Sequence, residues 1–285
     1  MSERKLAVIG AGTMGTGLAT LAVGHGLGVV LVDDSAEARD RAAGVVRQNL
    51  RMAQMLGKLP GGAPLDELLA LEADPKAAAG ADAVVECVVE RPGTKAEVLA
   101  AVSAAVGPGT PLLTNTSAIP VDELATAAVR PADVLGAHFM NPPYLIEGVE
   151  VVRGPRTAPG VLERALDLLT ALGRKPVVVG DGPGFVVNRV LQRMINEAAA
   201  IVQEGLATPE EVDALFTSCL GHRTGPLATG DLIGLDNVVD TLHVLHERTG
   251  DDGYRPCRLL LEKVEQGRFG RKTGSGFHAY GTGIA

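Results

Sequence analysis

A histidine and a glutamate, twelve positions apart, are the residues of this sequence best suited to move a proton. His138 ends an apolar run and precedes Phe139-Met140-Asn141-Pro142, and Glu150 lies within Val149-Glu150-Val151. A neutral imidazole can act as a general base near neutral pH, and a neighbouring carboxylate fixes its tautomer and favours its charged form. A lone histidine at a strand end is also commonly a structural residue, and sequence spacing alone does not pair His138 with Glu150.

Two further polar segments interrupt apolar sequence. Asn115-Thr116-Ser117 follows a short apolar run, and residues 181–189 combine turn residues with the start of a long predicted helix. In that helix Asn188, Gln192 and Asn196 recur every fourth position and so share one face. By itself the pattern fits a substrate face and a solvated face equally well.

A glycine-rich turn near the N-terminus has the pattern that binds a dinucleotide, Gly10-Ala11-Gly12-Thr13-Met14-Gly15. Its first glycine permits a tight turn, the second lets the backbone approach a pyrophosphate, and the third allows close helix packing. Alone, the motif is more often an ordinary glycine-rich turn. Here a predicted strand precedes it, a helix follows, and Asp33 ends the second strand 23 positions after Gly10. A carboxylate there can bind a ribose hydroxyl and repel a 2′-phosphate, which predicts NAD as the cofactor.

Apolar runs alternate with helical patterns over the first part of the chain. The predicted strands are residues 6–9, 29–32, 82–89, 112–114, 134–139, 149–152 and 175–179. The predicted helices are residues 13–26, 95–106, 122–129 and 159–172. This alternation predicts an α/β domain with a Rossmann-type, doubly wound, mostly parallel sheet over residues 1–182.

Strand patterns end near Gly180, and a second, all-helical domain is predicted over residues 183–285. Thr208-Pro209-Glu210-Glu211 has the residues of a capping box with proline at the first helical position. The other helices are predicted over residues 185–204, 225–248 and 256–266.

Composition limits the expected partners and location. The 285 residues are 46% hydrophobic, enough for two cores, and the net charge of −8 disfavours nucleic acid as a partner. The widely spaced Cys87, Cys219 and Cys257 predict free thiols in a reducing compartment and no metal site. Without a signal-peptide pattern or an 18-residue apolar stretch, a cytoplasmic protein that does not contact a membrane is expected.

The order and spacing of these motifs resemble the 3-hydroxyacyl-CoA dehydrogenase family over nearly the whole chain. The matching segments are the glycine loop, Val89-Glu90, Asn115-Thr116-Ser117, residues 138–142, Val149-Glu150-Val151, residues 181–189, Gly225-Pro226-Leu227, Gly234-Leu235-Asp236 and residues 270–277. The resemblance implies NAD-dependent oxidation of the C3 hydroxyl of a 3-hydroxyacyl thioester.

The same resemblance implies roles for single residues. It makes His138 the general base and Glu150 its partner, and it assigns Ser117 and Asn188 to the substrate's oxygen atoms. It places Glu90 and Lys95 near the ribose and nicotinamide of the cofactor. The cofactor is also expected to contact Asn115, Asp33 and the glycine loop. The loop residues are Gly10, Gly12, Thr13, Met14 and Gly15.

Departures from the family's pattern bear on the substrate. Pro60-Gly61-Gly62-Ala63-Pro64 breaks the region where the family has a long basic hairpin that helps to hold coenzyme A. Glu147 stands where relatives often have lysine, and His278 where they commonly have tyrosine. The thioester carrier therefore stays open between coenzyme A and an acyl carrier protein, which would bear a glyceryl or other small 3-hydroxyacyl unit in polyketide extender-unit biosynthesis.

Three further expectations concern function class and assembly. A free hydroxy acid or alcohol is a second possible substrate class, and a non-catalytic NAD-binding structural protein is an alternative from another class. A homodimer through the helical domain is expected from the family and from apolar helical faces in that domain. Those faces contain Leu191, Met194, Ile195, Leu242, Leu245, Leu259, Leu260 and Val264.

Overall fold

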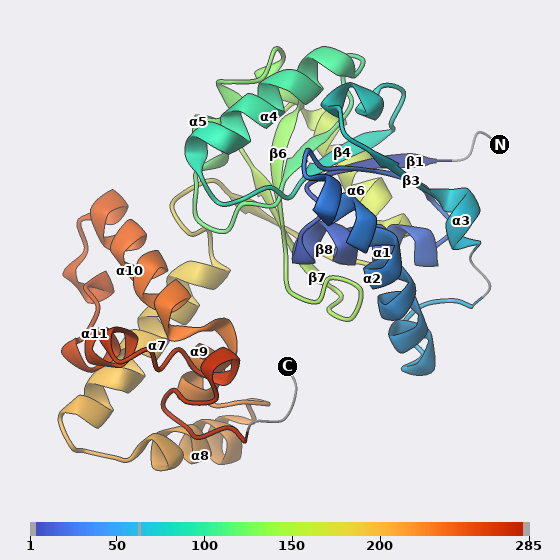
Figure 1. Cartoon of the computed structure of the whole chain (residues 1–285). Coiled ribbons are helices and arrows are strands. Elements are labelled where there is room, and N and C mark those ends of the chain that lie inside the picture. The colour runs from blue at the N-terminus through green and yellow to red at the C-terminus, as the bar shows by residue number, and fades with distance from the viewer. Residues whose placement is uncertain (1–3, 62–63, 282–285) are drawn as a thin grey trace. The chain divides into compact units, whose positions relative to one another are not determined.

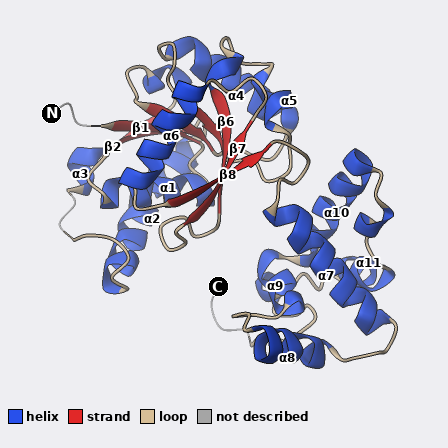
Figure 2. Cartoon of the chain, turned by 180° about the vertical axis from the view of Figure 1, so that it is seen from behind, coloured by secondary structure: helices blue, strands red, loops and turns tan. Residues whose placement is uncertain are grey.

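The computed structural model describes residues 4–61 and 64–281, and it divides into two compact units, Met1–Gly182 and Pro183–Ala285. Strands belong to the N-terminal unit, whereas helices dominate the C-terminal unit (Figures 1 and 2). Gly62 and Ala63, in the proline- and glycine-rich break, lie outside the described residues.

One sheet runs through the N-terminal unit, with the order β3-β2-β1-β4-β5-β6-β7-β8 among the described strands. The strands are β1 (Lys5–Ile9), β2 (Gly28–Val32), β3 (Leu69–Glu72), β4 (Ala83–Glu86), β5 (Leu112–Thr114), β6 (Val134–Phe139), β7 (Gly148–Arg153) and β8 (Lys175–Gly180). All neighbours pair in parallel except β6 and β7, which are antiparallel. The predicted doubly wound sheet is confirmed, whereas the strand predicted over residues 82–89 ends at Glu86 and β3 was not predicted.

Helices lie on both faces of this sheet, with α1 and α2 on the side opposite α4 and α5 (Figures 1 and 2). They are α1 (Thr13–Gly24), α2 (Ala36–Met55), α3 (Leu65–Leu68), α4 (Pro92–Ala105), α5 (Val121–Ala125) and α6 (Pro159–Ala171). The core that joins α1, α2 and α6 to the sheet is mainly aliphatic, with Val8, Leu21 and Leu31 at 0% exposure. Burial of these runs on both faces explains why the strands are continuously apolar.

The C-terminal unit contains α7 (Val187–Gln203), α8 (Pro209–Leu220), α9 (Pro226–Ile233), α10 (Leu235–Thr249) and α11 (Arg258–Glu265). Short 3₁₀ helices complete the chain: η1 (Pro75–Ala78), η2 (Pro131–Asp133), η3 (Asp252–Tyr254) and η4 (Arg271–Thr273). The predicted capping box of α8 forms, because Thr208 and Glu211 each accept a hydrogen bond from the other's backbone N–H.

The prediction of a single helix over residues 225–248 is wrong. Gly234 has φ +100°, a conformation that an α-helix cannot contain, so α9 ends there and α10 begins at Leu235. The Leu235 N–H then bonds to the carbonyl of Phe269 at 2.9 Å, which ties this corner to the C-terminal segment. In the described parts of the chain, no helix has the length and hydrophobicity to cross a bilayer.

Candidate active site

His138 and Glu150 are direct neighbours in the sheet. Antiparallel pairing of β6 with β7 places them opposite each other in register, and His138 Nδ1 lies 3.0 Å from Glu150 Oε2. Both residues are only 6% exposed. A carboxylate at Nδ1 favours the tautomer with the proton on that nitrogen, which leaves Nε2 able to accept a proton. The structure therefore brings together the two residues that sequence spacing alone could not pair.

The polar segment after β5 is bonded to the strand that carries the histidine. Asn115 Oδ1 accepts a hydrogen bond from the Phe139 N–H at 3.0 Å, and the Asn115 N–H donates to the Glu86 carbonyl at 2.9 Å. Asn115 thus fixes the ends of β4, β5 and β6 relative to one another. Because Oδ1 already accepts a backbone hydrogen bond, Nδ2 is the atom of this side chain that can donate to a cofactor.

Glu90 and Lys95 also meet at this edge of the sheet. Lys95 Nζ lies 3.2 Å from Glu90 Oε2 and 2.9 Å from Glu86 Oε1. Burial opposes the charge of Lys95, but the attraction of Glu86 and Glu90 outweighs it and holds the Lys95 pKa above its usual value. Glu90 Oε1 accepts the Ser117 N–H at 2.8 Å. Glu86 was not predicted as a site residue, although its position at the end of the buried run Val84-Val85-Glu86 was a visible sign.

The glycine loop has the shape that a pyrophosphate needs. A Cβ on Gly15 would lie 1.7 Å from the Gly10 carbonyl oxygen, whereas one on Gly12 would have no atom within 4 Å. Gly12 and Thr13 are exposed at the start of α1, Met14 is half-buried, and no side chain caps this helix end. Its first N–H groups can therefore bind an anion.

Asp33 lies beside this loop at the end of β2. Its Oδ2 accepts the Ala11 N–H at 2.7 Å and its Oδ1 accepts the Ser35 N–H at 2.9 Å. A cavity of about 430 Å³ adjoins the carboxylate and is lined in part by Gly10, Gly12 and Val88. This cavity lies at the carboxyl ends of β1, β2 and β4, where doubly wound sheets bind dinucleotides, so the residues present fit NAD.

The polar face of α7 is buried rather than solvated. Gln192 and Asn196 are 3% and 9% exposed, which rules out the solvated-face alternative for both. Asn196 is structural: Nδ2 donates to the carbonyls of Gly253 and Arg255, and Oδ1 accepts the Cys257 N–H. Gln192 Oε1 has no hydrogen-bond partner among the described residues. Asn188 is the second residue of α7 and is half-buried.

The closing segment of the chain is anchored on one buried carboxylate. Asp231 Oδ1 accepts the Phe277 N–H, and its Oδ2 accepts the His278 N–H and the Tyr280 hydroxyl. Burial and the Asp231 charge raise the pKa of Tyr280 to about 12. A Cβ on Gly276 would lie 1.9 Å from Asp231 Oδ1. The glycines of this segment therefore serve the folding of the C-terminal unit.

Metal and disulfide chemistry find no support in the described part of the chain. No group of three or more His, Cys, Asp or Glu side chains there is arranged to hold a metal ion. Cys87, Cys219 and Cys257 are free thiols, and burial raises the pKa of the Cys87 thiol, which disfavours the reactive thiolate.

Comparison with known proteins gives a match for each unit. The family model described as "3-hydroxyacyl-CoA dehydrogenase, NAD binding domain" matches residues 5–182, and "3-hydroxyacyl-CoA dehydrogenase, C-terminal domain" matches residues 184–280. A probable 3-hydroxybutyryl-CoA dehydrogenase of Deinococcus radiodurans is 41% identical over 278 residues, covering 97% of this chain and 100% of that protein. The 3-hydroxybutyryl-CoA dehydrogenase of Bradyrhizobium diazoefficiens is 38% identical, covering 97% and 95%. The crystal structure of (S)-3-hydroxybutyryl-CoA dehydrogenase from Ralstonia eutropha is 36% identical, with a TM-score of 0.92 and coverage of 99% and 100%.

Proposed function

Because the chain belongs to the 3-hydroxyacyl-CoA dehydrogenase family, we propose that it oxidises the C3 hydroxyl of a 3-hydroxyacyl thioester to the 3-oxo product. Family membership makes it an oxidoreductase with NAD as its cofactor. The observation that carries the proposal is the buried contact of His138 Nδ1 with Glu150 Oε2, at 3.0 Å. Coenzyme A is the first candidate for the carrier, because the relatives named above are described as acting on coenzyme A thioesters.

His138 is the general base of the proposed reaction. Its Nε2 takes the proton of the C3 hydroxyl as the C3–H bond breaks and the carbonyl forms. Bound NAD supplies the acceptor for the hydride that leaves C3. The positive charge that His138 gains is adjacent to the Glu150 carboxylate, which stabilises the charged imidazole.

The other site residues bind and orient. We assign Ser117 and Asn188 to the oxygen atoms of the substrate, so that C3 is held toward the nicotinamide. Glu90 and Asn115 lie at the carboxyl ends of β4 and β5, which supports their assignment to the ribose and nicotinamide end of the cofactor. Lys95 is only 1% exposed, so it would act on that end through Glu90 rather than by direct contact. The glycine loop and Asp33 would hold the pyrophosphate and the adenosine ribose.

Substitution of the pair tests the mechanism. His138→Ala should lower kcat on 3-hydroxybutyryl-CoA by roughly 10²- to 10⁴-fold, the usual contribution of a positioned general base. Glu150→Gln should lower it by a smaller but large factor, because residues that act as a unit are not additive. In wild type, activity should fall on the acid side of the pH profile as the base takes up a proton. NADH absorbance reports each rate.

His25→Ala is the matched control, since His25 belongs to the same unit and its ring bonds to the Leu21 carbonyl, away from the His138 pair. It should retain wild-type kcat. A His138→Ala enzyme within about threefold of wild type contradicts the assignment of the base. A wild-type protein that binds NAD but oxidises no thioester and no free hydroxy acid would instead support the non-catalytic alternative.

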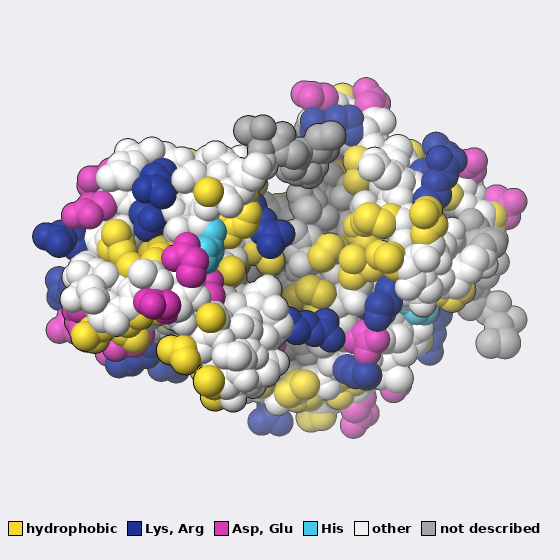
Figure 3. All heavy atoms as spheres, turned by 90° about the horizontal axis from the view of Figure 1, so that it is seen from below, with side chains coloured by type: hydrophobic (Ala, Val, Ile, Leu, Met, Phe, Trp, Pro, Cys, Tyr) yellow, Lys and Arg dark blue, Asp and Glu magenta, His cyan; other side chains and the backbone are white. Residues whose placement is uncertain are grey.

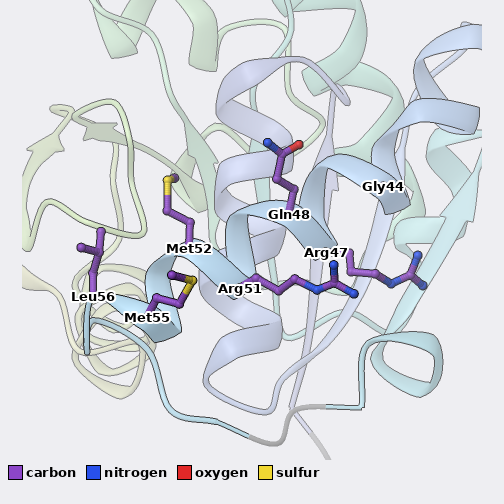
Figure 4. Close-up of a pocket in the computed structure, with 7 residues that line it drawn as sticks. All are labelled: Gly44, Arg47, Gln48, Arg51, Met52, Met55 and Leu56. Atoms are coloured by element: carbon purple, nitrogen blue, oxygen red, sulfur yellow. The ribbon is translucent and has the colours of Figure 1, made fainter.

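A surface on α2 favours an acyl carrier protein as the second candidate carrier. A cavity of about 520 Å³ lies along the second half of the helix, lined by Gly44, Arg47, Gln48, Arg51, Met52, Met55 and Leu56 (Figure 4). Met55 is 88% exposed and Leu56 is 59% exposed. In Figure 4 the two arginines extend to one side of the helix, and the methionines and Leu56 lie toward its C-terminal end. Figure 3 shows hydrophobic side chains gathered beside basic ones on the N-terminal unit.

Few cations on this surface are free to bind the phosphates of coenzyme A. Arg47 is already paired with Asp66 at 2.9 Å, and Lys58 lies 4.0 Å from Glu147. Among the described residues Arg51 has no ion-pair partner. One uncommitted arginine beside exposed apolar side chains matches the mixed apolar and charged contacts of a protein partner.

Two substrates separate the carriers. Turnover of 3-hydroxybutyryl-CoA is compared with that of a glyceryl-loaded carrier protein at equal concentration. Arg51→Glu should raise KM for the loaded carrier protein, whereas Lys76→Glu, which changes an exposed cation on η1 by the same charge, should not. Efficient turnover of the coenzyme A ester and none of the loaded carrier would eliminate the carrier protein.

We also propose a homodimer formed through the C-terminal unit, in a reducing compartment such as the cytoplasm. Four of the eight apolar residues that prompted this expectation do not support it, because Ile195, Leu242, Leu245 and Leu260 are fully buried in that unit's own core. Other hydrophobic side chains of the unit are more than half exposed: Val186, Val190, Leu206, Leu215, Leu220 and Leu232. A monomeric mass by light scattering at micromolar concentration would contradict the dimer.

A further inference from the structure

A lysine and a glutamate are buried together beneath the polar edge of the sheet. Glu86 is 0% exposed at the end of β4, and Lys95 is 1% exposed in the first turn of α4. Lys95 Nζ donates to both carboxylate oxygens of Glu86, at 2.9 and 3.1 Å. Those oxygens also accept the Thr114 hydroxyl and the Val88 N–H, each at 2.7 Å. The pair is therefore fixed by four hydrogen bonds, and water does not reach it.

Stability alone does not explain such a pair. Moving both charges out of water costs free energy that their attraction barely offsets, and apolar residues of similar volume often serve a core equally well. Buried charges cluster instead near functional sites. The residues that contact the Glu86–Lys95 pair therefore indicate which site the pair serves.

The next contact is Glu90, which is much more accessible, with 41% of its side chain exposed. Lys95 Nζ lies 3.2 Å from Glu90 Oε2. The other oxygen of Glu90 accepts the Thr116 hydroxyl, the Ser117 N–H at 2.8 Å and the Ala118 N–H at 3.3 Å. Glu90 is thus held on one side by the buried lysine and holds the segment after β5 on the other.

Without Lys95, a carboxylate this exposed would sample several rotamers, at a cost in side-chain entropy for any one of them. We propose that the buried Glu86–Lys95 pair fixes Glu90 where its carboxylate orders the backbone of Thr116, Ser117 and Ala118, which makes Glu86 a positioning residue for the oxidation. This inference rests on the proposed contact of Ser117 with the substrate. Glu86 acts through Lys95 and Glu90, since its complete burial excludes contact with a ligand.

Glu86→Gln is the direct test, because it preserves size and removes the charge that holds Lys95. Hydrogen exchange of the Ser117 and Ala118 amides should become at least about tenfold faster, since exchange reports local opening. With 3-hydroxybutyryl-CoA, kcat should fall by at least about tenfold, because small errors in orientation are costly in rate. Both readouts are taken at saturating NAD, because displacement of Lys95 and Glu90, which are assigned to the cofactor, should also raise KM for NAD.

Asp133→Asn is the matched control. Asp133 is also a buried carboxylate of the N-terminal unit, 5% exposed and paired with Arg130 at 2.9 Å, but it bonds to Gly109 and not to the segment after β5. The Asp133→Asn substitution should lower the urea midpoint without changing kcat or the Ser117 exchange rate. If Glu86→Gln does not fold, Thr114→Val removes one bond to Glu86 and should change both readouts in the same direction.

Unchanged exchange at Ser117 and Ala118 in a folded Glu86→Gln protein overturns the inference. So does faster exchange with kcat within twofold of wild type, and so does an equal loss of kcat in Asp133→Asn at a matched urea midpoint. The exchange arm needs no substrate. A wild-type protein that oxidises no thioester would refute the proposed function while the exchange result still reports whether Glu86 orders this segment.

Discussion

Two glycines of the cofactor loop, three positions apart, should respond in opposite ways to the same added methyl group. Gly12 has φ −72° and ψ −167°, which alanine adopts without strain, and a Cβ there meets no atom within 4 Å. Alanine stabilises a helix N-terminus less than glycine does, but it also reduces the conformational entropy of the unfolded chain. The two effects on the free energy of unfolding are of similar size and opposite sign. The free energy of unfolding of Gly12→Ala should therefore stay within about 1 kcal/mol of wild type.

Cofactor binding should nevertheless weaken in Gly12→Ala, because the methyl group occupies the space through which a pyrophosphate approaches the backbone. Loss of one charge-assisted hydrogen bond costs about 1.5–3 kcal/mol, or roughly 10- to 150-fold in Kd. NAD at 100 times the wild-type Kd stabilises wild type by about 2.7 kcal/mol. If Kd rises about 100-fold, the same concentration stabilises the variant by only about 0.4 kcal/mol.

Gly15→Ala should fail at folding instead. Its Cβ would lie 1.7 Å from the Gly10 carbonyl oxygen, and this backbone contact must widen to at least 3.0 Å. That displacement separates α1 from β1, so the variant should be destabilised by about 3 kcal/mol or more. Thermal unfolding with and without NAD measures both variants. A Gly12→Ala protein that gains the wild-type stabilisation from NAD would refute the assignment of this loop to the pyrophosphate.

Three further predictions follow from single contacts. Asp33→Ser should weaken NAD binding and reduce the preference for NAD over NADP. A wild-type kcat/KM with NADP comparable to that with NAD would contradict the role of Asp33. Tyr280, with its pKa raised to about 12, should ionise late in an absorbance titration, and Tyr280→Phe should remove that late component. Because the fold favours the neutral phenol, its contribution to stability is complete below the ordinary tyrosine pKa of about 10 and is lost as the pH rises toward 12. Gln192→Leu should raise the urea midpoint, since it removes a buried oxygen that lacks a partner in the described chain; a lower midpoint would indicate an unseen partner.

Sequence patterns identified His138 and Glu150 but not their contact, because the direction of β7 decides it. Alternating strands and helices predict parallel neighbours, yet only eight residues, 140–147, connect β6 to β7. A parallel crossover needs a dozen or more residues, so this loop length already indicated an antiparallel pair. In that arrangement the register places the two side chains directly opposite each other.

Other elements carried weaker patterns. β3 has only four residues, Leu69–Glu72, and none of them is fully buried at this edge of the sheet, so no continuous apolar run marks it. The break at Gly234 depends on its positive φ, and glycine within a helical pattern does not by itself predict one. Glu86 and Lys95 are nine positions apart, and only the packing of α4 against β4 makes them partners.

Asp33 has a consequence for attempts to redesign cofactor preference. The carboxylate that would select a ribose hydroxyl also accepts the backbone N–H groups of Ala11 and Ser35, one within the glycine loop and one at the start of α2. Replacing it with a small neutral residue to admit a 2′-phosphate removes both bonds, so selectivity and loop order change together. A variant library for NADP use would therefore need a second substitution that again satisfies the Ala11 amide. Screening at position 33 alone would recover enzymes with relaxed selectivity and poor affinity for either cofactor.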